Sequence, residues 1–142
     1  MILFVALALA AGVCLALQAP TNAALAARTG LPVAILANAV LGLLLSLGMW
    51  LLLRAPVAPE AGRPAPAHWL GGLYGFAIVT LSAIAVARLG ATRTLTILVA
   101  AQAGTALVLD HVGALGLPRA PVTATRLLGV ALVVGGAWLV RR

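Results

Sequence analysis

Two carboxamide side chains, Gln18 and Asn22, stand four residues apart in the first apolar stretch of this chain. Residues at that spacing share one face of an α-helix. Pro20 lies between them, and its ring leaves the carbonyl of Ala16 without its helical donor. The pattern predicts a hinge at Pro20, kinked and partly unwound, that presents backbone groups and two amides to a bound molecule. The alternative is that both amides only hydrogen-bond neighbouring helices.

Two more amides, Asn38 and Gln102, lie inside later apolar stretches. A polar side chain in an apolar environment needs a hydrogen-bonding partner or a hydrated cavity. We therefore expect Asn38 and Gln102 to face a cavity and to form, with the first two amides, a binding site for a small polar molecule. Hydroxyl side chains such as Thr80 and Ser82 are expected instead to bond the carbonyls of their own helix.

Asp110 closes the fourth apolar stretch and is followed by His111. An acid at the C-terminal end of a helix opposes the helix dipole, so a nearby arginine or a cap on the next turn must compensate. Asp and His are also the usual proton-relay groups inside membranes. Two roles therefore stay open for Asp110: a structural salt bridge, or titration in proton coupling with His111 beside it.

The elements that carry these residues are five apolar runs in a chain of 142 residues. Hydrophobic residues make up 64% and charged residues 8%, far from the composition of soluble domains. About 20 apolar residues span a hydrocarbon core. We predict an all-α integral membrane protein, one domain over 1–142, with five transmembrane helices over about 2–25, 31–53, 69–87, 92–109 and 122–140. Residues 54–68, with four prolines, are predicted to form a loop.

Glycines mark one turn and one packing surface. Arg88 and Gly90 place a cation in the last turn of the third helix and a glycine just after it, which predicts the end of that helix. Thr92 is then expected to cap the fourth helix. Small-xxx-small spacing, which lets helix backbones approach closely in lipid, occurs at Gly71, Gly72 and Gly75. We expect these three to pack against a helix of the same chain, or else of a second copy.

The nine arginines divide almost evenly between the two sides of the membrane that five alternating spans would cross. One side would carry four, namely Arg54, Arg63, Arg119 and Arg126, and the other five, namely Arg28, Arg88, Arg93, Arg141 and Arg142. Orientation normally follows an excess of Lys and Arg in the cytoplasmic loops. With so small a bias, the chain is expected to insert both ways round (dual topology) and to pair with its own inverted copy as an antiparallel homodimer, an arrangement related to the inverted repeats of secondary transporters.

Composition and absent residue types exclude several classes of function. The basic residues stand at the ends of apolar runs, where they meet lipid headgroups, so the net charge of +7 does not indicate nucleic acid. No acid stands in the middle of an apolar run, which disfavours a cationic solute and favours a polar uncharged or anionic one. The lone Cys14 has no partner at metal-ligand spacing, and no soluble domain is attached. We expect no enzymatic activity, no metal and no cofactor.

The run Gln18-Ala-Pro-Thr-Asn22-Ala-Ala-Leu25 in the first helix resembles the YdcZ-type proteins of the drug/metabolite transporter superfamily. So do four later pieces, Gly71-Gly72-Leu73-Tyr74-Gly75, Arg88-Leu89-Gly90-Ala91, Gln102 and Asp110-His111-Val112-Gly113-Ala114-Leu115-Gly116. The match continues to Gly129 and so covers essentially the whole chain. The resemblance implies a five-helix, multi-pass domain of the bacterial inner (plasma) membrane, occurring singly, as paired genes or as fused antiparallel halves. It also implies transport.

Three functions remain open. The first is a secondary transporter that works by alternating access as an antiparallel homodimer, with a small-molecule substrate, its own inverted copy and the lipid bilayer as its partners. The second is a small channel, which needs polar groups through the whole membrane thickness, whereas here they are concentrated. The third is a non-transporting membrane subunit or assembly factor, in which the amides join helices. We favour the transporter.

Overall fold

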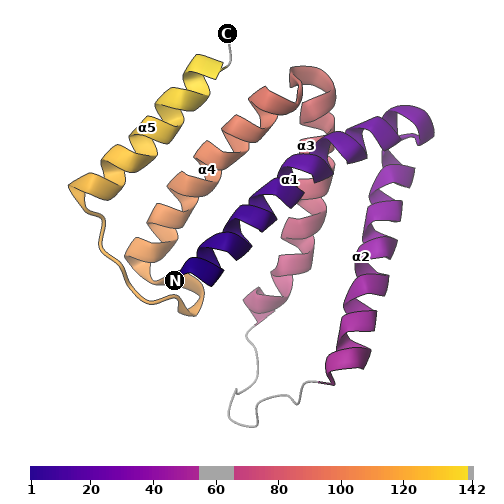
Figure 1. The fold of residues 1–142 in the computed structure, drawn as a ribbon, viewed down its shortest axis with the longest axis horizontal. Helices are drawn as coiled ribbons and strands as arrows, with labels where there is room; N and C mark the ends of the chain where they lie inside the picture. Colours follow the sequence, from indigo (N-terminus) through magenta and orange to yellow (C-terminus); the bar gives the residue numbers. More distant parts are fainter. Residues whose placement is uncertain (55–65, 141–142) are drawn as a thin grey trace. The chain divides into compact units, whose positions relative to one another are not determined.

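The computed structural model describes residues 1–54 and 66–140, which form five α-helices and two short 3₁₀ segments (Figure 1). The α-helices are α1 (Ile2–Thr29), α2 (Leu31–Leu53), α3 (Gly71–Leu89), α4 (Ala91–Val112) and α5 (Ala124–Val140). The 3₁₀ segments are η1 (Pro66–Leu70), before α3, and η2 (Ala114–Gly116), after α4. No strand occurs among these residues, in agreement with the predicted all-α fold.

Four of the helices, α1 to α4, are long and apolar enough to cross a membrane. The fifth has 17 residues, so its axis measures about 25 Å at 1.5 Å per residue, less than the roughly 30 Å of a hydrocarbon core. It begins at Ala124, later than the expected start near Val122. All five predicted segments are therefore helical, while a crossing by α5 stays a prediction.

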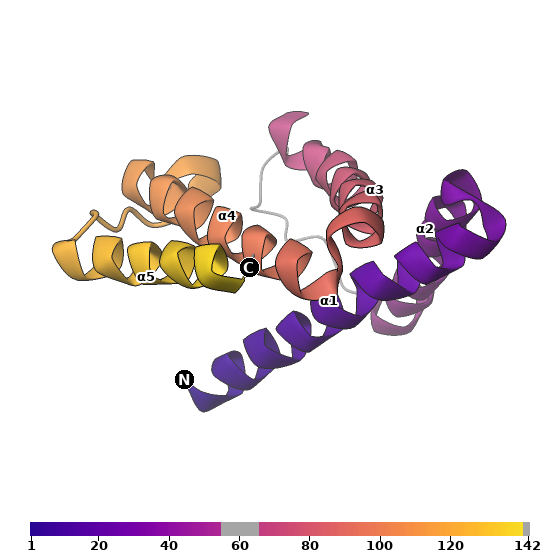
Figure 2. The ribbon, with the colours of Figure 1, turned by 90° about the horizontal axis from the view of Figure 1, so that it is seen from above.

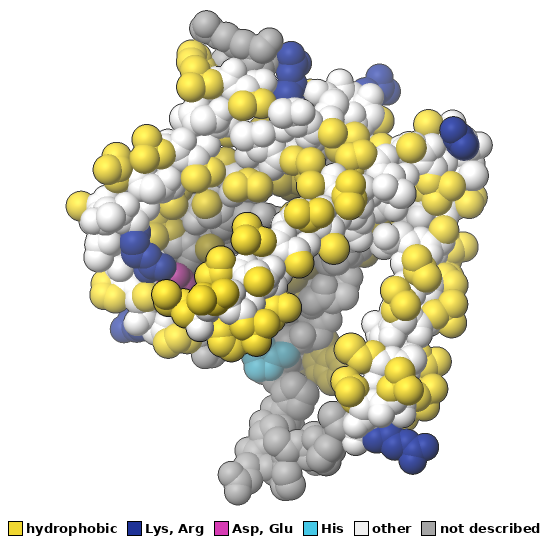
Figure 3. Space-filling view, in the orientation of Figure 1, with side chains coloured by type: hydrophobic (Ala, Val, Ile, Leu, Met, Phe, Trp, Pro, Cys, Tyr) yellow, Lys and Arg dark blue, Asp and Glu magenta, His cyan; other side chains and the backbone are white. Residues whose placement is uncertain are grey.

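Large apolar side chains point outward along the helices (Figure 3). In each of the four long helices, at most 17% of the most apolar window is buried within the described structure. Apolar surface of this extent is incompatible with water and suits lipid or another apolar chain.

The chain divides into two compact units, Met1–Ala87 and Arg88–Arg142, each with its own helix packing. In the first unit α1 packs against α2, and in the second α4 packs against α5. The prediction of one domain over 1–142 stays a prediction.

In the first unit, α1 and α2 form a hairpin that turns at Gly30, and they separate with distance from the turn (Figures 1 and 2). Gly30 has a φ of +89°, which side-chain-bearing residues rarely adopt. Its N–H donates to the carbonyl of Ala26 at 2.9 Å, and its carbonyl accepts the N–H of Ala34 at 3.2 Å. One residue therefore closes α1 and opens α2. Ala34 is buried one helical turn after Gly30, where a small side chain suits close packing.

Pro20 does not interrupt α1, which is helical from Ile2 through Thr29. The expectation of a partly unwound segment is therefore wrong. Membrane helices tolerate proline where nearby groups satisfy the freed backbone. The Thr21 hydroxyl beside the proline donates to the carbonyl of Leu17 at 2.7 Å, not to the carbonyl of Ala16 that the proline frees. The role of Pro20 as a hinge stays a prediction.

In the second unit, α4 and α5 lie side by side (Figures 1 and 2). α4 ends at Gly113, whose φ of +66° lies in the left-handed region that favours glycine. Thr123 opens α5: its Oγ1 accepts the N–H of Arg126 at 3.3 Å, and its carbonyl accepts the N–H of Leu127 at 3.0 Å. Both ends of the connecting segment are thus fixed by local backbone chemistry.

The turn into α2 and the turn into α4 repeat one another at an offset of 60 residues. Arg28 and Arg88 each precede a glycine by two positions, and Gly30 and Gly90 both have positive φ, +89° and +81°. Buried residues recur at the same offset, in the pairs Ala19 and Val79, Asn22 and Ser82, and Ala34 and Thr94. Residues 19–34 and 79–94 are therefore locally equivalent segments.

The helix ends around Gly90 and the loop before α3 agree with the sequence predictions only in part. The predicted helix end before Gly90 is confirmed, but the predicted cap is wrong, because Gly90 itself precedes α4 and no side chain caps it. Thr92 lies inside the first turn, where its carbonyl accepts the hydroxyl of Thr96 at 2.7 Å. Of the predicted loop 54–68, residues 55–65 lie outside the described residues, and the part from Pro66 onward already belongs to η1.

Candidate functional site

Three of the four predicted binding amides meet between α1 and α2. Gln18 Nε2 donates to Asn38 Oδ1 at 3.4 Å, and Asn22 Nδ2 donates to the same oxygen at 3.5 Å. Asn22 and Asn38 each stand eight residues from Gly30, so a hairpin that turns there brings them to one level. Gln18 lies one helical turn before Asn22. Equal distance from Gly30 is the sequence signal that pairs Asn22 with Asn38, and the sequence prediction did not use it.

This amide cluster (Gln18, Asn22 and Asn38) leaves most of its hydrogen-bonding capacity unused. A carboxamide has two N–H donors and an oxygen that can accept two bonds. Three groups have no hydrogen bond to a described residue: Asn38 Nδ2, Gln18 Oε1 and Asn22 Oδ1. Asn22 is only 7% exposed, Asn38 is half-buried and Gln18 is exposed. Polar groups at such positions need a ligand, water or a second chain to complete their bonding.

Gln18 and Asn38 open onto a hollow of about 330 Å³ that all three helices of the first unit line. α2 also contributes Ile35 and Ala39, and α3 contributes Gly72, Gly75, Phe76 and Val79. Apart from the two amides, none of the described residues that line the hollow has a polar side chain. Small-molecule sites are typically of this kind, about 300 to 1,000 Å³ in volume and mostly apolar with a few polar groups. We call this space the amide pocket.

The three glycines of α3 do not pack closely against a helix of the first unit. A Cβ built on Gly71, Gly72 or Gly75 would meet no atom within 4 Å. Close packing within the chain, the first expectation, is therefore not seen in this unit, and Gly72 and Gly75 line the amide pocket instead. Packing against a second copy stays a prediction.

The fourth predicted amide, Gln102, lies apart from this cluster in the chain, on α4 in the second unit. It is exposed and makes no hydrogen bond to a described residue. Its place in a binding site stays a prediction.

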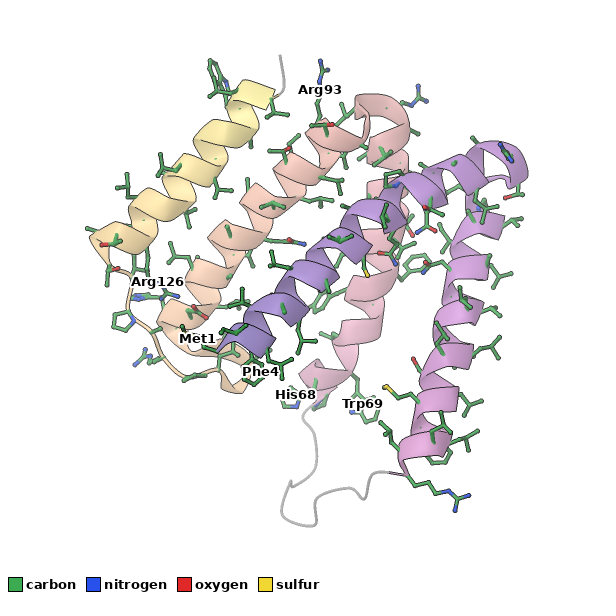
Figure 4. The ribbon with its side chains drawn as sticks, in the orientation of Figure 1. Met1, Phe4, His68, Trp69, Arg93 and Arg126 are labelled. Atoms are coloured by element: carbon green, nitrogen blue, oxygen red, sulfur yellow. The ribbon has the colours of Figure 1, made fainter. Side chains whose placement is uncertain are left out.

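Asp110, near the end of α4, pairs with Arg126 from the first turn of α5 (Figures 3 and 4). Arg126 Nη2 donates to Asp110 Oδ2, and Arg126 Nη1 donates to the carbonyl of Ala120 at 3.1 Å. The N–H of Ala120 in turn donates to the backbone carbonyl of Asp110 at 2.8 Å. The expectation that an arginine could compensate this acid is confirmed.

His111 takes part in the same connection. Its Nδ1 accepts the N–H of Val122 at 3.4 Å, a bond that requires this nitrogen to be unprotonated. A hollow of about 410 Å³ lies between α4 and α5, and Asp110 and Arg126 are the polar side chains that line it. The pair is about one-third exposed, so it is within reach of solvent. Proton coupling through Asp110 and His111 stays a prediction.

The hydroxyl groups behave largely as expected. Thr80 Oγ1 donates to the carbonyl of Phe76 at 2.8 Å, and Ser82 Oγ donates to that of Val79 at 3.3 Å. Thr94, which the sequence patterns did not single out, is 3% exposed and its Oγ1 has no partner. The sequence alone carries no signal for Thr94, because the burial of Ala34, its counterpart at an offset of 60, is known only from the structure.

Membrane-length helices with apolar side chains facing outward define a multi-pass membrane protein. Residues 3–139 match a family model, DMT_YdcZ, described as "Putative inner membrane exporter, YdcZ". The chain therefore belongs to the YdcZ family of inner-membrane transporters, as the resemblance in its sequence implied. No curated protein and no solved structure matches it. Within the described ranges, no group of three His, Cys, Asp or Glu side chains could hold a metal ion.

Proposed function

We propose that this protein is a secondary transporter that moves a small polar solute, uncharged or anionic, by alternating access in an antiparallel homodimer. Gln18, Asn22 and Asn38 bind the solute in the amide pocket. The observation that carries the proposal is the meeting of three amides, with unpaired donors and acceptors, beside an open hollow of about 330 Å³. Gln102 is a candidate fourth amide, contributed by α4.

The long contacts within the cluster favour binding over a purely structural role. N–H···O hydrogen bonds usually measure about 2.9–3.0 Å, whereas the two bonds to Asn38 measure 3.4 and 3.5 Å. Interhelical hydrogen bonds in membranes average about 0.6 kcal/mol. Two long ones together contribute about 1 kcal/mol or less to joining α1 and α2. Such bonds are readily exchanged for bonds to a solute.

The antiparallel dimer rests on the balance of the arginines, four against five. A loop-charge bias of this size gives the insertion machinery little to select by. Gly71 has open space around its backbone within the first unit, which leaves room for a helix of a second copy. In such a dimer, rocking of one copy against the other would expose the amide pocket to each side of the membrane in turn.

The test is a ligand-stability screen on the purified protein in detergent, with Gln18→Ala and Asn22→Ala as variants. A solute that binds only the folded protein raises the free energy of unfolding by about 2.7 kcal/mol when the solute concentration is about 100 times the Kd. Thr21→Ala is the matched control, because its hydroxyl bonds only the Leu17 carbonyl of its own helix. We expect a solute that stabilises the parent and the control but not the amide variants.

Folding and dimerisation of all three variants should remain near normal, as read by size-exclusion chromatography and circular dichroism. Amide variants that assemble poorly, yet bind the solute normally once assembled, would identify the cluster as a structural joint between helices and overturn the proposal.

A further inference from the structure

The chemistry of the amide pocket narrows the class of solute. We propose that the solute bound by Gln18, Asn22 and Asn38 carries no net charge. We also propose that the lack of side chains at Gly72 and Gly75 of α3 sets how large a solute the pocket accepts. This inference rests on the proposed transport site and narrows it, because that proposal also allows an anion.

Among the described residues, no charged side chain lines the pocket. Along α1, Arg28 is ten residues from Gln18 and six from Asn22, about 15 Å and about 9 Å at 1.5 Å per residue. Arg54 follows the end of α2, sixteen residues from Asn38, or about 24 Å. Neither guanidinium makes a hydrogen bond to an amide of the cluster. A charge removed from water without an opposite charge is strongly disfavoured, whereas a hydroxyl or an amide needs only hydrogen bonds.

The amide cluster can offer either donors or acceptors. In the structure Asn38 Oδ1 accepts two bonds, from Gln18 and Asn22, so the N–H groups of Asn38 are free. Turning the three carboxamides over would reverse every bond, because the two ends of a carboxamide have nearly the same shape. Asn38 would then donate to the oxygens of Gln18 and Asn22, and its own oxygen would be free. Such a cluster matches groups that both donate and accept, which are hydroxyl and carboxamide groups.

The side of the pocket formed by α3 has no side chains at two positions, Gly72 and Gly75. Gly72 and Gly75 are three residues apart, on one face of α3, and Phe76 and Val79 continue that wall. A Cβ added at either glycine would meet no atom within 4 Å. A methyl group there would therefore occupy free pocket space without displacing a neighbour in the first unit. Larger solutes should lose more from this change than smaller ones.

The first experiment compares solutes of matched shape and different charge, with the stability of the full-length protein as readout. One set is sorbitol, gluconate and glucamine, and the other is benzamide, benzoate and benzamidine. The neutral member of at least one set should bind at least tenfold more tightly than its charged counterparts. Gln18→Ala should abolish that binding, and Thr21→Ala should leave it unchanged.

The outcomes separate this inference from the function on which it rests. If gluconate, benzoate or a cationic probe binds as tightly as its neutral counterpart and needs Gln18, the pocket is a binding site but the inference is wrong. If no probe, neutral or charged, shows binding that needs Gln18, the amide pocket is not the site and both proposals fall.

The second experiment tests the wall with three alanine variants, using the neutral probe that binds most tightly and a smaller neutral probe, glycerol. Gly72→Ala and Gly75→Ala should weaken the larger probe at least tenfold and change glycerol by less than threefold. Gly42→Ala in α2 is the matched control, since Gly42 has the same open surroundings but does not line the pocket. Equal weakening in all three variants, or in none, would overturn the role of the two glycines.

Discussion

The ion pair between Asp110 and Arg126 offers the sharpest quantitative prediction. Three variants are informative: Asp110→Asn, Arg126→Met and the double variant. Both side chains are about one-third exposed, at 33% for Asp110 and 37% for Arg126. Hydrogen bonds to charged groups contribute about 1.5–3 kcal/mol when shielded, and exposed ion pairs about 0–1 kcal/mol. A partly exposed pair should therefore contribute about 1–2 kcal/mol.

The two single variants should differ in cost. Asp110→Asn loses the pair but removes an acid from the last turn of α4, which returns about 0.3–1 kcal/mol through the helix dipole. Its net cost should be about 1 kcal/mol. Arg126→Met loses the pair and also the bond to the Ala120 carbonyl, a further loss of about 1 kcal/mol, and it leaves Asp110 uncompensated. Its net cost should be about 2–3 kcal/mol.

The assay is unfolding of the purified protein in mixed detergent micelles, read as a double-mutant cycle. The coupling energy should be about 1–2 kcal/mol. Arg93→Met is the control, because Arg93 is exposed and points away from the helices in Figure 4. A surface change of this kind should alter stability by no more than about 0.5 kcal/mol. A coupling energy near zero, with equal losses in both single variants, would refute the reasoning from the pair.

The same Asp110→Asn protein separates the two roles of this acid. If Asp110 also couples transport to protons, the variant in proteoliposomes should exchange solute at zero gradient but lose uphill transport driven by a pH gradient. A structural pair alone predicts lower yield and stability with no selective effect on coupling. Unchanged gradient-driven transport in the well-folded variant would exclude the proton role.

Two further predictions concern topology and backbone conformation. C-terminal reporter fusions, one active on each side of the membrane, should both give signal because the loop arginines are nearly balanced. Three or four lysines added at one end should fix the orientation. Signal from a single reporter in the unmodified chain would exclude self-pairing. Gly113→Ala should lower the stability by about 1–2 kcal/mol, since Gly113 has a φ of +66° and the new Cβ would lie 2.8 Å from Arg119 Cγ. Gly135→Ala inside α5 should instead raise the stability by about 0.5–1 kcal/mol. Equal shifts in the thermal midpoint of unfolding for the two variants would contradict this.

Apolar runs predicted the helices well because helix length in a membrane protein follows the thickness of the bilayer. The predicted second span, 31–53, coincides with α2, where Gly30 and the left-handed Arg54 bound the helix. The first prediction, 2–25, stopped before Arg28, but α1 continues to Thr29. A charge marks where a membrane ends, whereas a helix ends where its hydrogen bonds end, here at Gly30.

Side-chain pairing was less accessible from the sequence than the helices were. An arginine was expected beside Asp110, but the chain has nine, and Arg126 is selected only by the path of the segment between α4 and α5. Likewise, Gln18 and Asn22 were placed on one face by their spacing, but their common contact with Asn38 depends on the position of the turn at Gly30. The helical backbone at Pro20 could not be read from proline chemistry alone, because neighbouring groups decide whether a proline breaks a membrane helix.

The two equivalent segments supply an internal control for the role of the amides. The offset of 60 places Ile78, Ser82 and Leu98 where the first segment has Gln18, Asn22 and Asn38. Asn22 and Ser82 are both buried, at 7% and 5% exposure, so the register is the same while the amides are not. Residues 79–94 therefore share the buried register and the positive-φ glycine of residues 19–34 without an amide cluster. Asn38→Leu, which copies the residue of the second segment, should cost the first unit about 1–3 kcal/mol, because it removes the acceptor of the buried Asn22 amide. It should nevertheless abolish solute binding in the stability screen. A large loss of stability with binding intact would instead mean that the first hairpin, unlike the second segment, depends on its amides for folding.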